Sequence, residues 1–230
     1  MAKFAASNPI SWSLFYHLQS MYKSGVETLI DKQPFRRVKL NGFCPYSLSA
    51  FPLAVAAWEA FLNENCMSIA IESDYPDNVL WDIREQAEKW DNKQKAYLVP
   101  KLLLGQTFDK GSQPYQDFAL LVEIRNDIVH FRLEDAPTRA LKDLAQRKIT
   151  LVPPDKTQYS WPLQLQSTEV IRWSINTIAK MVQTLTRFFP EGQWPGTSLA
   201  FNEISESQAR ETFIKAHIDP DIVESDITES

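Results

Sequence analysis

The sequence predicts an all-α protein, an antiparallel bundle of four to five helices with additional helices at the N- and C-terminal ends. Glycine occurs only 6 times in 230 residues, whereas all-β folds use glycine in many tight turns. The 14 prolines cluster at joints between apolar segments, and a helix tolerates proline in its first turn but not in its interior. Between the prolines, apolar residues recur every three or four positions, which is the period of an amphipathic helix.

Eight segments carry this helical period. They are 11–30, 47–71, 77–90, 92–104, 114–131, 137–148, 167–189 and 206–217. The second is richest in alanine and leucine, and Pro52 falls in its first turn, where proline is tolerated. The seventh is long, with Ser167 or Thr168 as its N-cap and Pro190 as its stop. We expect the glycine-containing stretch after 104 to be a loop and 152–166 to be an extended connection or a short hairpin-like arm.

The chain length fits one domain, because single hydrophobic cores commonly serve chains of roughly 100–250 residues. We expect residues 1–204 to form a single helical domain whose core spans about 47–190. Residues 205–230 would then hold a C-terminal helix and an acidic tail, which we expect to be mobile because it offers little to bury.

Charge and composition limit the function classes. A net charge of −5 argues against broad non-specific binding to polyanions, which needs many cationic contacts to phosphates. It leaves room for a small local basic site. The two cysteines, Cys44 and Cys66, are too few for a disulfide framework, and Cys66 is best interpreted as a small buried apolar residue. With neither a secretory signal nor a run of about 20 apolar residues, we expect a cytoplasmic protein without a membrane partner.

The stretch 123–134, EIRNDIVHFRLE, places strong hydrogen-bonding side chains in an apolar helix. At 100° per residue, Leu120, Leu121, Ile128 and Phe131 lie near Ile124 and form the stripe that faces the core. Ala119, Glu123, Asn126 and His130 share the far side, with Asn126 and His130 one turn apart. Arg125 lies between this polar stripe and a second apolar strip formed by Val122 and Val129.

A purely solvated helix face would be rich in lysine and glutamate, and this one is not. Charged residues are depleted where protein surfaces meet, so the face suggests contact with a second subunit. Two simpler interpretations stay open, because a histidine in the last turn often interacts with the helix dipole or caps a carbonyl, and an asparagine on a helix is often only exposed.

Residues 125–130, Arg-Asn-Asp-Ile-Val-His, resemble the R-(polar)-x-x-x-H signature of the HEPN superfamily. These are small helical-bundle proteins, many of which are metal-independent RNA endonucleases. Residues 54–62, AVAAWEAFL, are similar to the Ala/Leu-rich helix with an internal glutamate that often precedes the motif. The resemblance covers roughly residues 47–189.

The resemblance implies a homodimer in which the motif helices of two protomers meet in one cleft. His130 would act as general base or acid on the ribose 2′-hydroxyl, Arg125 would stabilise the scissile phosphate, and Asn126 would orient the substrate or the histidine. Arg132, Glu123 and Glu59 are further candidates for substrate binding. No metal or cofactor is expected, since no metal-ligand spacing such as HExxH or paired CxxC occurs.

One departure from the family pattern concerns position 132. Some members continue the motif as H-x-Tyr, with a tyrosine that a partner nucleotidyltransferase modifies, but here the residue is Arg132. Arg132 could add to the phosphate-binding charge or form a salt bridge, for example with Glu59.

We therefore expect a homodimeric endoribonuclease that acts on single-stranded or tRNA-like RNA, as a toxin with an antitoxin partner or as a phage-defence effector. A non-catalytic RNA- or nucleotide-binding module and an interaction scaffold are the alternatives.

The remaining candidates have weaker signals. The cluster Arg36, Arg37 and Lys39 is the one dense group of cations and could touch an RNA backbone, although such runs are more often solvated surface. Most tryptophans should belong to the core rather than stack on bases. His17 and His217 are expected to be structural or incidental.

Overall fold

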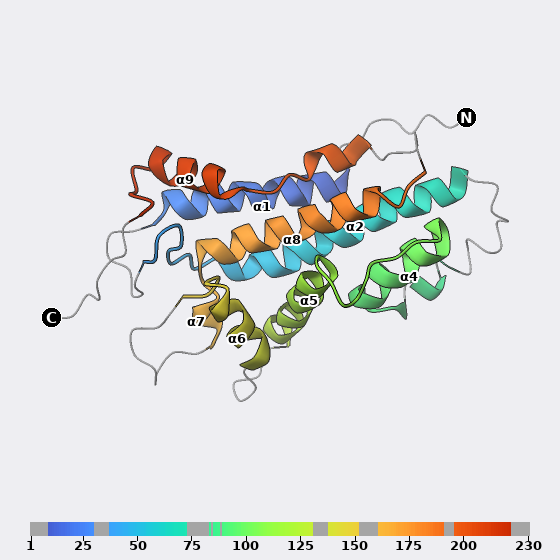
Figure 1. Ribbon diagram of the computed structural model, residues 1–230, viewed down its shortest axis with the longest axis horizontal. Helices are drawn as coiled ribbons and strands as arrows, with labels where there is room; N and C mark the ends of the chain where they lie inside the picture. Colours follow the sequence, from blue (N-terminus) through green and yellow to red (C-terminus); the bar gives the residue numbers. More distant parts are fainter. Residues whose placement is uncertain are drawn as a thin grey trace.

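The computed structural model shows an all-α protein (Figure 1) and confirms the predicted fold class. It describes residues 9–29, 37–72, 83, 85–87, 89–130, 138–151, 161–190 and 196–221. Within these ranges the β pairing consists of two isolated bridges, Val38 with Asn41 and Phe43 with Ser167. Among the same residues, none of the helices has the length and apolar character needed to cross a membrane.

Except for the short helix Trp161–Gln164, the helices lie close to their predicted positions. They are α1 (Ile10–Glu27), α2 (Ala50–Glu72), α4 (Asn92–Leu104), α5 (Tyr115–Val129), α6 (Thr138–Gln146), α7 (Trp161–Gln164), α8 (Thr168–Thr186) and α9 (Glu206–Lys215), with 3₁₀ turns η1 (Ser47–Ser49) and η2 (Gly196–Ala200). Of the segment predicted as a helix at 77–90, residues 77–82, 84 and 88 lie outside the described residues.

Three long helices, α1, α2 and α8, run side by side through the molecule (Figure 1) and pack against one another. Their fully buried side chains, such as Phe15, Trp58 and Ile178, belong to one hydrophobic core. We expected the first helix as an addition to the bundle, and it contributes to this same core. Helix α8 begins where predicted, because the hydroxyl of Ser167 accepts a hydrogen bond from the Val170 N–H at 3.2 Å and caps the helix.

The other helices lie on opposite sides of the α2–α8 pair. Helix α9 lies beside α1 on one side, whereas α4, α5, α6 and α7 lie on the other (Figure 1). Helix α2 is thus covered from two directions, which explains its nearly continuous apolar sequence. Helices α4 and α5 both pack on α2 and on each other, and this three-helix junction positions the candidate site.

Two local predictions need correction. The end of the expected extended arm forms the helical turn α7, because Pro162 has its φ fixed near the helical value and lies in a first turn, where its missing N–H costs nothing. The prediction of a solvated basic cluster is wrong for Arg37, which is 3 % exposed and donates from Nη2 to the Asp219 carbonyl at 2.8 Å. Arg36 and residues 152–160 lie outside the described part of the chain.

Candidate functional site

Helix α5 is held by an apolar face that fits against α2 and α8. Phe118, Leu121 and Ile124 are fully buried on this face, and Ile128 is partly buried against the same core. The predicted core stripe is therefore confirmed for Leu121 and Ile124, while Phe131 lies outside the described residues. The core fixes the orientation of the helix, and hence of the motif residues between the core positions.

Three of the four residues of the predicted polar stripe face outward, whereas Ala119 is partly buried against the core. Glu123, Asn126 and His130 are exposed. The second apolar strip is only half correct, because Val129 is 52 % exposed whereas Val122 is 2 % exposed. Val122 lies on the side of α5 that α2 and α4 cover, and so it belongs to the core. Val129 is the exposed apolar residue beside the motif.

Arg125 occupies the border between buried and exposed surface. Its Nη1 donates a hydrogen bond to Oδ1 of Asn126 at 2.9 Å, which joins the first two motif residues into one polar unit. Its Nε is buried and has no hydrogen-bond partner among the residues that the structure describes. A buried donor without an acceptor costs roughly 1–3 kcal/mol, so this position of the guanidinium is unfavourable unless another group bonds Nε.

A pocket of about 330 Å³ opens beside Arg125, at the junction of α2, α4 and α5. It is lined by Glu59 from α2, by Trp90, Asp91, Asn92, Lys93 and Lys95 at the start of α4, and by Val122, Arg125 and Asn126 from α5. Three helices distant in sequence therefore contribute polar side chains to one concave surface.

An ion pair and a helix cap shape the walls of the pocket. The ammonium of Lys95 donates to the Glu59 carboxylate and joins α4 to α2. Asp91 caps α4 by accepting from the Gln94 N–H at 2.8 Å, and the Gln94 side chain accepts in return from the Asp91 N–H. The lining carries three cations and two carboxylates, so its formal charge is +1 although the whole chain carries −5.

The structure separates His130 from this pocket. Helix α5 ends at Val129, and His130 is its C-cap, with its N–H donating to the Asn126 carbonyl at 2.9 Å. Its imidazole is exposed and is not part of the pocket lining. Among the predicted site residues, Arg125, Asn126 and Glu59 thus meet at one pocket, Glu123 and His130 face outward, and Arg132 lies outside the described residues.

The other histidines lie away from this junction. His17 is exposed on α1, and His217 is exposed just after α9, on the opposite side of the α2–α8 pair. Among the residues that the structure describes, no group of three or more histidine, cysteine, aspartate or glutamate side chains is arranged to hold a metal ion.

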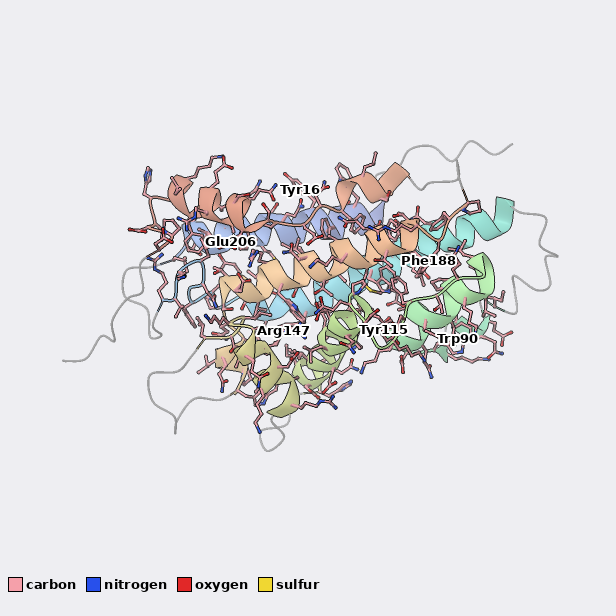
Figure 2. All side chains as sticks on the ribbon, viewed as in Figure 1. Tyr16, Trp90, Tyr115, Arg147, Phe188 and Glu206 are labelled. Carbon is pink, nitrogen blue, oxygen red and sulfur yellow. The ribbon has the colours of Figure 1, made fainter. Side chains whose placement is uncertain are left out.

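The sequence did not reveal the α4 side of the site. Trp90, Lys93 and Lys95 line the pocket, and Figure 2 shows Trp90 by the start of α4. The segment Trp90-Asp91-Asn92-Lys93 has an aromatic residue, a cap and a cation together, but nothing in this spacing indicates a site. Only the packing of α4 against α5 brings these residues to Arg125.

Comparisons of the chain with protein-family models, with curated proteins and with solved structures each found no match. The resemblance to HEPN proteins therefore depends on the motif residues themselves.

Proposed function

We propose that the protein is a HEPN-like, metal-independent endoribonuclease that acts as a homodimer in the cytoplasm. The observation that carries the proposal is the placement of the motif. Arg125 and Asn126 form a hydrogen-bonded pair at the edge of a polar pocket, and His130 is exposed one turn further along the same helix. A motif retained only for packing would instead be expected to point into the core.

In the proposed reaction, His130 takes the proton of a ribose 2′-hydroxyl, and the 2′-oxygen attacks the adjacent phosphorus. A bond forms between O2′ and phosphorus and the bond from phosphorus to O5′ breaks, giving a 2′,3′-cyclic phosphate and a 5′-hydroxyl. A second imidazole or water protonates the leaving O5′. Arg125 stabilises the charge that develops on the phosphate oxygens.

The dimer supplies that second imidazole. The outward face of α5 carries Glu123, Asn126, Val129 and His130, and Val129 is an apolar side chain left 52 % exposed. A two-fold axis near Val129 would set α5 against the α5 of a second copy, since such an interface uses the same patch on both subunits. Both Arg125–His130 sets would then share one cleft.

The test is incubation of the purified full chain with total RNA in EDTA, with His130→Ala compared with His17→Ala. His17 is exposed on α1 and His130 is exposed at the C-cap of α5, so the two variants should fold equally well. We expect the wild type and His17→Ala to cleave RNA and His130→Ala to lose cleavage. Cleavage that survives in His130→Ala would overturn the mechanism.

A second candidate is a non-catalytic RNA- or nucleotide-binding protein. The position of His130 outside the pocket that Arg125 and Asn126 line favours it, because binding needs only the pocket. RNA binding by the wild type without cleavage would select this candidate.

The toxin or phage-defence role, with its antitoxin partner, follows from the resemblance. Growth arrest on expression in bacteria, absent for His130→Ala, is the result expected of a toxin.

A further inference from the structure

The pocket beside Arg125 has the size of a site for one small ligand. Its volume of about 330 Å³ lies at the lower end of the range of roughly 300–1,000 Å³ that is usual for such sites. A single nucleotide fits this size, and a stretch of duplex does not. A base that is stacked and paired in an RNA duplex would have to leave the duplex to enter this pocket between three protein helices.

The wall residues suit a nucleobase. Trp90 lines the pocket and is partly buried against the core, which leaves the rest of its side chain accessible. Stacking on an aromatic ring accepts any base, because every base has a π face. Val122 adds an apolar wall, and Oδ1 of Asn126 already accepts from Arg125, so the amide NH₂ is what Asn126 offers to acceptors on a base.

Two further features suit a phosphate. Arg125 lines the pocket and carries a fixed positive charge, with which a phosphate oxygen would pair. Lys93 lines the same pocket, while the charge of Lys95 is already paired with Glu59. A formal charge of +1 at this pocket, in an otherwise acidic chain, favours one phosphate group over a long polyanionic track.

We infer that the pocket of α2, α4 and α5 binds one unpaired nucleotide of an RNA strand, with its base on Trp90 and a phosphate near Arg125 and Lys93. The inference rests on the proposed function, since the choice of RNA as the ligand comes from the Arg125–His130 motif. It specifies the substrate as RNA with at least one unpaired nucleotide next to the scissile phosphate.

Binding is measured by fluorescence anisotropy with a labelled single-stranded octanucleotide of mixed sequence, fully 2′-O-methylated. Without a free 2′-hydroxyl it cannot be cleaved by transesterification, so binding is separated from chemistry. We expect Trp90→Leu to weaken binding by about 5- to 100-fold, the range for losing one base-stacking contact. Trp12→Leu is the control, because Trp12 is a partly exposed tryptophan on α1, away from the pocket.

A second pair of variants covers the case in which Trp90→Leu does not fold, as judged by circular dichroism. Lys93→Glu reverses one charge in the pocket and should weaken binding by about tenfold or more, whereas Lys142→Glu, exposed on α6, should leave binding unchanged. The same octanucleotide annealed to its complement should bind at least about tenfold more weakly. Unchanged binding by folded Trp90→Leu and Lys93→Glu, or equal binding of the duplex, overturns the inference.

The outcome separates this inference from the proposed nuclease. If RNA cleavage depends on His130 but its KM is the same in Trp90→Leu as in the wild type, the nucleotide subsite is wrong and the proposed nuclease stands. Binding that depends on Trp90, in a protein that cuts no RNA in EDTA, keeps the subsite and removes the nuclease.

Discussion

At the scale of single residues, Arg125 shows how one side chain can have both a buried and an exposed part. Its Nη1 donates a hydrogen bond to Asn126, whereas its Nε is buried without a partner in the described part of the chain. The arrangement costs stability and is expected where a charge must be ready for a ligand. Arg125 should therefore matter for activity and hardly at all for folding.

We expect Arg125→Ala to lower kcat for RNA cleavage by about 10²- to 10³-fold, as for loss of one group that stabilises transition-state charge. Arg125→Lys should recover only part of the rate, because an ammonium lacks the planar fork of donors. The measurement is the initial cleavage rate in EDTA, with melting temperature as the folding check. Arg187→Ala, exposed at the end of α8, is the matched control, and a wild-type rate in Arg125→Ala would contradict the role.

Cys44 supplies a prediction about pH. The Cys44 side chain is 1 % exposed. Its Sγ packs close to Gly25, 3.3 Å from the position that a Cβ would occupy there. Burial raises the pKa of the thiol to about 11. A group whose pKa is raised by folding stabilises the fold fully below its unfolded pKa and loses that contribution as the pH rises through the folded pKa.

We therefore expect the free energy of unfolding to fall between pH 9 and pH 11, with Cys44 contributing about 2–3 kcal/mol of the fall at most. Urea denaturation across this range should show a shallower fall for Cys44→Ala than for the wild type, since tyrosines and lysines titrate alike in both. Equal slopes would show that the thiol does not carry the effect.

At the scale of elements, α5 has three faces with different surroundings. One face is apolar and fixes the helix on α2 and α8, one carries Arg125 at the pocket, and one carries Val129 and His130 outward. Its N-terminal turn is tied to the residue that follows α6 by an ion pair, in which Nη1 of Arg147 lies 2.5 Å from Oδ1 of Asp117. Asp117 is buried, so this link should stabilise the orientation of the motif helix.

Arg147→Ala should lower the free energy of unfolding by about 2 kcal/mol, because it leaves the buried Asp117 carboxylate without its cation. We expect less than the full effect of a buried pair, since the Arg147 side chain is 33 % exposed. Urea denaturation is the measurement. Arg210→Ala breaks an exposed Arg–Asp pair with Asp221 and should leave stability unchanged, and equal effects of the two substitutions would contradict a role for burial.

At the scale of the whole molecule, the two sides of the α2–α8 pair differ in character. The side with α1 and α9 carries His17 and His217, whereas the side with α4 and α5 carries the pocket and the motif (Figure 1). The proposed dimer uses the second side alone, through the outward face of α5.

Val129→Lys should convert a dimer into a monomer of 26.5 kDa and abolish cleavage, because two lysines would meet at the two-fold axis. Light scattering coupled to size exclusion gives the mass. Leu199→Lys, at a side chain 73 % exposed in η2, is the control and should stay dimeric. A dimeric Val129→Lys variant, or a monomeric wild type that cleaves RNA, would contradict the proposed dimer through α5.

The predictable part of the fold follows from local patterning. The spacing of apolar residues and the glycine after Leu104 gave α4 its bounds, although Pro100 lies inside this helix, against the proline rule. Ser167 marked the start of α8. Helix periodicity and capping act within a few residues. The misplaced features needed long-range information. Arg37 is buried by its contact with Asp219, a residue far along the chain, and Val122 is covered by neighbours that a helical wheel does not contain.

The same division holds for the candidate site. The sequence alone determined that Arg125, Asn126 and His130 lie away from the core stripe of the α5 segment, because a 3.6-residue period fixes the angles between side chains. Only the tertiary structure decided that Arg125 and Asn126 share a pocket with Glu59 and Trp90 while His130 does not. The physical reason is that a pocket is set by how α2, α4 and α5 pack, and the spacing of residues within one helix carries no information about that packing.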